Sequence, residues 1–78
     1  MNPKNSNVEV DQMAVAALKI LRRRKVEERT TLSRTTIYEL VKAGQFPRPI
    51  ALTKKSVGWL SHEIDDWLKR QITLRDSK

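Results

Sequence analysis

The clearest apolar periodicity in the chain lies near its middle. Ile37, Leu40 and Val41 recur at the spacing of one α-helical face. Ser33 is a suitable N-cap, because its hydroxyl can accept from backbone N–H groups of the first turn. Gly44 is well placed to end the helix in a left-handed conformation. The pattern therefore predicts a short helix between these two end signals, with a narrow apolar stripe.

The opposite face of this predicted helix is polar and rich in hydrogen-bond donors. It comprises Arg34, Thr35, Tyr38 and Lys42, with Thr36 nearer the edge. Such a helix suits insertion into the major groove of DNA, where base edges present donors and acceptors.

A shorter helix is predicted just upstream, from about Arg23 to Thr30, with Val26 as its one clear inward position. Few residues separate it from the Ser33 helix, so the chain must turn sharply, as in a helix-turn-helix. Many helical proteins contain such a corner without binding DNA, so the corner alone leaves function open.

The N-terminal part of the chain gives weaker signals. Residues 1–10 are polar and are expected to form a disordered tail. Asp11 could cap a helix over about residues 11–19; its apolar stripe would comprise Met13, Ala14, Ala17, Leu18 and Leu21. Alternatively, Ile20 and Leu21 leave this helix and run extended into the domain.

Beyond Gly44 the chain cannot stay helical, because Pro47 and Pro49 interrupt it. Phe46 is expected to fold back onto the core. Residues 50–52 and 57–60 then predict a β-hairpin with Lys54 and Lys55 at its tip. Lysines there could reach phosphate oxygens, or could be an ordinary solvated tip.

A last helix is predicted to begin at a Ser61 cap and to present an apolar face. That face comprises Ile64, Trp67, Leu68 and Ile72. Trp59 and Trp67 are interpreted as core residues, with stacking on exposed bases as the alternative. Residues 73–78 are expected to form a flexible tail.

Composition adds a strong positive charge to this picture. The chain has 78 residues, no cysteine and a formal net charge of +7, with a pI of about 10.3. Such a charge favours a polyanionic partner over a basic surface kept for solubility. An acidic lipid surface is disfavoured, because no helix combines a basic face with bulky aromatics. We expect a cytoplasmic protein without membrane association.

The sequence does not suggest an enzyme. The lone His62 has no cysteine or second histidine as a partner, and no glycine-rich phosphate loop is present. The acidic pairs at 27–28 and 65–66 are sequence neighbours that point in different directions on helices. No catalytic residue, cofactor or metal is expected.

Four stretches together resemble the AlpA-type prophage regulatory proteins. These stretches are Leu32–Tyr38, Gly44–Pro47, Lys55–Leu60 and Glu63–Leu68, and the resemblance covers roughly residues 20–72. The family belongs to the MerR-like winged-helix superfamily, which also includes many excisionases. The resemblance implies a winged helix-turn-helix fold, mainly α-helical with a small β-hairpin wing, and we expect the single domain to span residues 11–72. It places the Ser33–Ala43 helix in the major groove and the hairpin beside it.

On that arrangement the expected DNA-binding residues lie on the helix-turn-helix and at the wing tip. They are Arg24, Ser33, Arg34, Thr35, Thr36, Tyr38, Lys42, Lys54, Lys55 and Ser56. Two features depart from the family: Thr31 stands where a glycine is usual in the corner, and the wing tip lacks the frequent glycine.

The resulting functional hypothesis is a sequence-specific protein that binds and bends double-stranded DNA. It would regulate transcription, direct excision as an excisionase, or do both, with an integrase as a candidate further partner. We expect a monomer in solution or cooperative binding on DNA. The alternative is a protein-interaction module that captures a partner on the apolar face of the Asp11–Leu21 segment or of the last helix.

Overall fold

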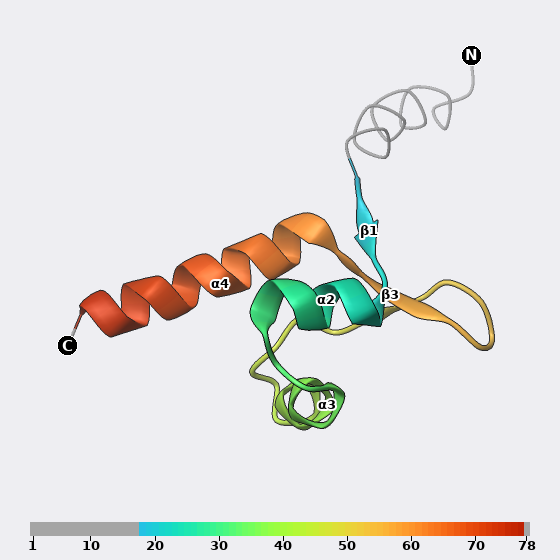
Figure 1. Ribbon diagram of the computed structural model, residues 1–78, viewed down its shortest axis with the longest axis horizontal. Helices are drawn as coiled ribbons and strands as arrows, with labels where there is room; N and C mark the ends of the chain where they lie inside the picture. The colour runs from blue at the N-terminus through green and yellow to red at the C-terminus, as the bar shows by residue number, and fades with distance from the viewer. Residues whose placement is uncertain (1–17, 78) are drawn as a thin grey trace, which may run out of the picture.

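The computed structural model describes residues 18–77, which combine helices with a small antiparallel sheet (Figure 1). The elements in chain order are β1 (Ile20–Leu21), α2 (Arg23–Thr30), α3 (Arg34–Lys42), β2 (Ile50–Ala51), β3 (Val57–Leu60) and α4 (Ser61–Asp76). The mainly α-helical winged helix-turn-helix fold is confirmed. The expected tail over residues 1–10 and the expected helix from residue 11 lie outside the described residues, apart from its last positions.

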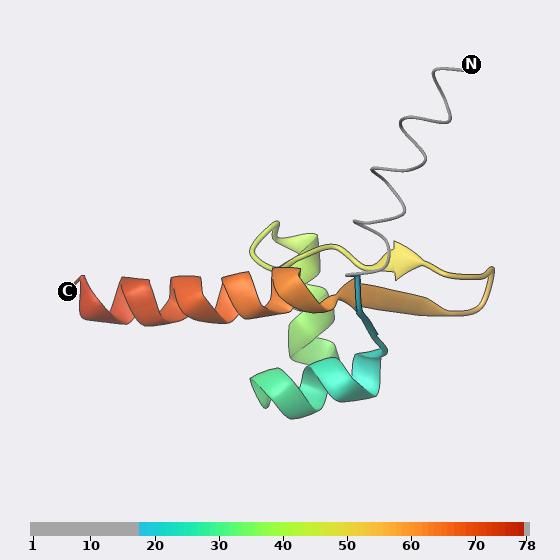
Figure 2. The same ribbon diagram turned by 90° about the horizontal axis from the view of Figure 1, so that it is seen from above.

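The sheet has the strand order β1-β3-β2, with both pairings antiparallel. Leu21 pairs with Trp59, and Ala51 pairs with Val57. The extended alternative for residues 20–21 is therefore confirmed. Helix α4 leaves the sheet in the direction opposite to the β2–β3 hairpin, so the hairpin projects as a free wing (Figures 1 and 2).

The core contains five buried side chains, each from a different segment of the chain. These are Val26 of α2, Ile37 of α3, Phe46 of the connecting loop, Trp59 of β3 and Ile64 of α4. The expected inward positions of Val26 and Phe46 are confirmed. Trp59 is fully enclosed, and its indole Nε1 donates to the carbonyl oxygen of Pro47 at 2.8 Å. Full enclosure excludes the alternative in which Trp59 stacks on an exposed base.

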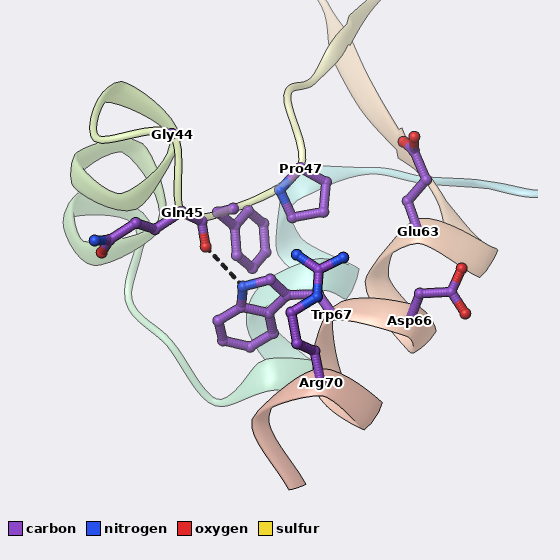
Figure 3. A pocket seen from close by; sticks show the side chains of 8 residues that line it. Gly44, Gln45, Pro47, Glu63, Asp66, Trp67 and Arg70 are labelled. Carbon is purple, nitrogen blue, oxygen red and sulfur yellow. Dashed lines mark hydrogen bonds between the residues drawn. The ribbon is translucent and has the colours of Figure 1, made fainter. Parts of the chain in front are cut away.

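Trp67 contributes less to the core than expected. It is half-buried, and its ring packs edge-on against Phe46 with centroids 4.8 Å apart. Its Nε1 donates to the carbonyl oxygen of Gln45 at 2.7 Å, the bond drawn in Figure 3. Trp67 therefore holds the loop after α3 against α4 at the edge of the core.

Both ends of α3 form as the sequence predicts. Ser33 Oγ accepts from the Thr36 backbone N–H at 3.2 Å, which confirms the N-cap. At the other end Gly44 has φ +74°, and its N–H donates to the carbonyl of Val41 at 3.0 Å. The next N–H, of Gln45, donates to the carbonyl of Leu40 at 2.8 Å. This pair of bonds is a Schellman motif, for which glycine in the left-handed region is favoured.

The corner between α2 and α3 turns at Thr31, which has φ 61° and ψ 13°. This is the left-handed region that a family glycine would occupy without strain. Thr30 supports the corner from inside: it is buried, donates its hydroxyl to the Val26 carbonyl at 2.8 Å and accepts from the Leu32 N–H at 3.2 Å. The corner therefore forms without glycine, at a cost in backbone strain.

Replacing that residue with glycine is expected to stabilise the domain. A left-handed conformation costs a residue with a Cβ about 1–2 kcal/mol, part of which the greater unfolded-state freedom of glycine offsets. Thr31→Gly should therefore raise the free energy of unfolding by about 1 kcal/mol in urea denaturation. Thr31→Ala keeps the Cβ and serves as the control. Equal destabilisation by both variants would show that residue 31 does not hold a positive φ in solution.

The predicted Ser61 cap is wrong. Leu60 occupies the N-cap position of α4, and no side chain caps the helix. The helix begins one residue earlier than expected, with Ser61 as its first residue, and the Ser61 N–H donates to the Lys19 carbonyl at 2.8 Å where the β1–β3 pairing meets the helix. The Ser61 hydroxyl lies 3.5 Å from Arg29 Nη1, and Arg29 also pairs with Asp65. These contacts fasten α2 to the start of α4.

The distal half of α4 departs from expectation in two ways. Ile72 is 51 % exposed, so the inward face predicted for this helix stops before it. The helix also continues to Asp76, into the segment expected to be a tail from residue 73. The flexibility of that segment stays a prediction.

Candidate nucleic-acid interface

A groove of about 530 Å³ runs between the wing and the N-terminal ends of α2 and α3. It is lined by Arg22, Arg23, Arg24, Arg34, Tyr38, Lys54, Lys55, Ser56 and Val57. Within residues 18–77 every charged side chain on this lining is cationic. Three segments distant in sequence thus place six cations around one depression.

The ends of the two helices strengthen this positive field. Neither α2 nor α3 has an acidic residue in its first turn, and each begins with an arginine, Arg23 or Arg34. The N-terminus of a helix already carries partial positive charge, so cations there repel it. An anion in the groove would offset both the arginine charge and the helix dipoles. This arrangement is suited to phosphate.

Most of these cations are available to a ligand. Arg23 forms an ion pair with Glu27, with Nε 3.0 Å from the carboxylate oxygen. Among the described residues none of the other five lining cations forms an ion pair. A phosphate would therefore not have to break a salt bridge to reach them.

The wing tip is ordered by hydroxyl groups in place of glycine. Thr53 Oγ1 lies 2.7 Å from Ser56 Oγ and accepts from the Lys55 N–H at 3.1 Å. The Ser56 carbonyl also accepts from the Leu52 N–H at 2.9 Å. Threonine and serine hydroxyls can close a turn in this way because they bond the backbone two residues on. The closed turn holds Lys54 and Lys55 at the edge of the groove.

Tyr38 joins the groove to the core. Its ring centroid lies 6.2 Å from that of Trp59 in a tilted arrangement, while the residue keeps 37 % exposure. A stable tertiary contact therefore positions this exposed aromatic side chain on α3.

Six of the ten predicted site residues line the groove: Arg24, Arg34, Tyr38, Lys54, Lys55 and Ser56. The other four do not. Ser33 Oγ donates to Thr36 Oγ1 at 3.0 Å, so both hydroxyls are engaged at the helix cap. Thr35 and Lys42 are exposed on α3 outside the groove.

Sequence reasoning missed Arg22 and Arg23 as groove residues. The signal for them is the run of four cations from Arg22 to Lys25, of which Arg24 alone is among the predicted site residues. The structure places the first three on the groove, because β1 ends and α2 begins beside the wing.

A second cavity, of about 320 Å³, has the opposite character (Figure 3). It lies between the loop after α3 and helix α4, and Glu63, Asp66 and Arg70 line it beside Trp67. Its carboxylates make it unsuitable for a polyanion. Within residues 18–77 no cluster of His, Cys, Asp and Glu could hold a metal ion, and none of the helices described has the length and apolar character to cross a membrane.

Comparison with known proteins gives a consistent family. Residues 19–72 match the sequence profile described as Prophage CP4-57 regulatory protein (AlpA). The chain is 37 % identical over 65 residues to the DNA-binding transcriptional activator AlpA of Escherichia coli (strain K12), covering 76 % of this chain and 93 % of that protein. It is 46 % identical over 44 residues to the uncharacterized protein ORF88 of Enterobacteria phage P4. That match covers 56 % of this chain and spans half the length of the phage protein.

Proposed function

The chain belongs to the AlpA family of prophage regulatory proteins, and we propose that it is a DNA-binding transcriptional regulator. One observation carries this proposal: five cations that form no ion pair within residues 18–77 converge with two helix N-termini on a single groove. Clustered arginine and lysine neutralise DNA phosphates and release condensed counterions. The E. coli relative, described as a DNA-binding activator, supports the same conclusion.

We assign the residues of this interface to two roles. Helix α3 enters the major groove, where Arg34 and Thr35 read base edges and Lys42 follows along the same helix. Thr36 is a further candidate for base reading, because its Oγ1 accepts from Ser33 Oγ and its own O–H stays free to donate to a base edge. The groove cations hold the flanking phosphates: Arg22 and Arg24 from one side, and the wing lysines from the other.

We extend the proposal to two further points: the protein bends DNA, and it acts in excision together with an integrase. Both activities would take place in the cytoplasm. The wing projects beyond the helix-turn-helix, so it would contact the duplex outside the major groove that α3 enters (Figure 2). Bending the duplex toward the protein would bring more phosphates within reach of the wing. Measuring the end-to-end distance of a doubly labelled duplex tests this role. A shortened distance on binding supports bending, and an unchanged distance opposes it.

The binding surface can be mapped directly by titrating the isotope-labelled chain with a duplex and following backbone amide shifts. Shifts should concentrate at Arg22–Arg24, the first half of α3 and the wing tip. The Glu63–Arg70 stretch beside the acidic cavity serves as the internal control and should stay unchanged. Shifts confined to α4 would overturn the proposed surface.

A further inference from the structure

The outer face of the sheet is apolar and open to solvent. Leu18, Ile20, Ile50 and Leu52 are each 38–41 % exposed. Scattered exposed apolar residues are common on protein surfaces, but a contiguous group indicates a surface that another element covers. Ile20 lies in β1 and Ile50 in β2, the two strands that flank β3 on opposite sides, and Leu18 and Leu52 lie two positions from them along the chain.

Strand register places these residues together. Ile20 pairs with Leu60, and Ile50 pairs with Gly58, which are the positions alternating with the buried Trp59. Because side chains alternate along a strand, all of these positions point away from the core. We call the set formed by Leu18, Ile20, Ile50, Leu52, Gly58 and Leu60 the outer sheet face.

Gly58 confirms that side chains from both flanking segments meet over the central strand. A Cβ placed on Gly58 would collide with Ile20 Cγ2 and would lie 3.1 Å from Leu52 Cδ1. Ile20 and Leu52 therefore pack across the glycine from opposite sides. The result is one continuous apolar surface on the back of the wing.

We propose that the segment over residues 11–17 of the same chain docks on the outer sheet face. This segment joins the described part at Leu18, which is itself a member of that face. Its sequence predicts an amphipathic helix with Met13, Ala14 and Ala17 on one side. Seven helical residues span about 10 Å, comparable to two neighbouring strand spacings.

Tethering and charge favour this occupant over a separate partner. The segment is covalently attached at the edge of the face, so docking is intramolecular and has a high effective concentration. Between residues 5 and 17 the charged residues are Glu9 and Asp11, both acidic. The wing carries the exposed cations Lys54 and Lys55, so the segment adds no like charge to it. Apolar and electrostatic complementarity therefore act together.

Docking would brace the wing from behind. Within residues 18–77 the hairpin joins the rest of the sheet through β3, which pairs with β1, while the two-residue strand β2 lies at the edge and pairs with β3 alone. A helix packed across β1, β3 and β2 would tie these strands together on the face opposite Trp59. This inference does not depend on DNA binding.

Paramagnetic relaxation on the full chain tests the proposal. Because the sequence has no cysteine, Lys54→Cys gives one attachment point for a nitroxide, at the tip of the wing that carries the outer sheet face. We expect strong broadening of the amides of residues 11–17. The control label at Arg75→Cys, at the far end of α4, should leave these amides sharp (Figure 1).

Mixing experiments identify the occupant. Isotope-labelled chain without nitroxide, mixed with unlabelled chain carrying it, should show no broadening of residues 11–17. Broadening only in the mixed sample would mean that a second copy covers the face and would overturn the intramolecular proposal. Absence of broadening in both samples would show that the face is open, and would also overturn it.

A matched pair of substitutions provides an independent readout. Ala17→Asp adds a charge to the predicted apolar stripe, whereas Gln12→Asp adds the same charge to the opposite side. Ala17→Asp should abolish the nitroxide broadening and lower the midpoint of thermal unfolding. Gln12→Asp should preserve both. Equal behaviour of the two variants would contradict docking through this stripe.

Discussion

Trp59→Ala is expected to leave much of the domain unfolded at physiological temperature. Trp59 is completely buried, forms the centre of the core and donates a hydrogen bond to the Pro47 carbonyl. Replacing a buried tryptophan by alanine costs about 3–5 kcal/mol. A domain of this size has a total stability near the lower end of about 5–15 kcal/mol. The midpoint of thermal unfolding, followed by circular dichroism, should therefore fall by at least about 10 °C.

Trp67→Ala is the matched control for this substitution. Trp67 loses the same number of atoms, but it is only half-buried and lies at the edge of the core. Its replacement should lower the unfolding midpoint by less. If the Trp67 variant were the less stable of the two, the assignment of Trp59 as the central core residue would be wrong.

Arg34→Ala is expected to weaken binding to the preferred DNA site by about 1–3 kcal/mol and to relax the preference at one base position. Arg34 is the first residue of α3 and lies on the cationic groove. Arginine there can donate to two acceptors of a guanine edge in the major groove. The measurement requires a preferred site, obtained by selection from random duplexes, and titration against that site and a scrambled one.

Arg75→Ala removes an equal charge from the far end of α4, where Arg75 pairs with Asp76. It should change neither affinity nor base preference appreciably. If Arg34→Ala weakens the preferred and the scrambled duplex equally, Arg34 holds a phosphate and does not read a base. The assignment of base reading would then move along α3 to Thr35.

The parts of the fold that sequence predicts well are those fixed by local chemistry. The cap at Ser33 and the Schellman ending at Gly44 involve residues only a few positions apart, so their signals are complete within the helix itself. Val26 and Phe46 were also identified as inward, because each is the one clear apolar position in its polar segment.

The errors arise where a distant segment changes a local preference. Ser61 has the sequence of a cap, but it is the first residue of α4, where its N–H donates to the Lys19 carbonyl, more than forty positions earlier. Ile72 continues the apolar stripe of α4, yet the helix has passed the edge of the domain before reaching it. The sequence of a helix shows neither which distant segment its backbone bonds to nor how far the rest of the domain extends alongside it.

The candidate site shows the same division. Arg34, Lys54 and Lys55 were predicted because a polar helix face and a charged hairpin tip are local features. Arg22 and Arg23 line the same groove because β1 ends, and α2 begins, beside the wing. That placement depends on the tertiary structure. Sequence therefore identified the cationic stretches without showing which of them face one ligand.

The dependence of duplex binding on salt tests the central claim, that the cationic groove holds DNA phosphates. Affinity for random duplex should fall steeply with salt, with a slope in log units of about −0.9 for each phosphate neutralised. Lys54→Ala with Lys55→Ala should reduce the magnitude of that slope by about two, whereas Lys69→Ala with Arg70→Ala on α4 should leave it unchanged. An unchanged slope in the wing variant, with a reduced slope in the α4 variant, would contradict the proposed interface.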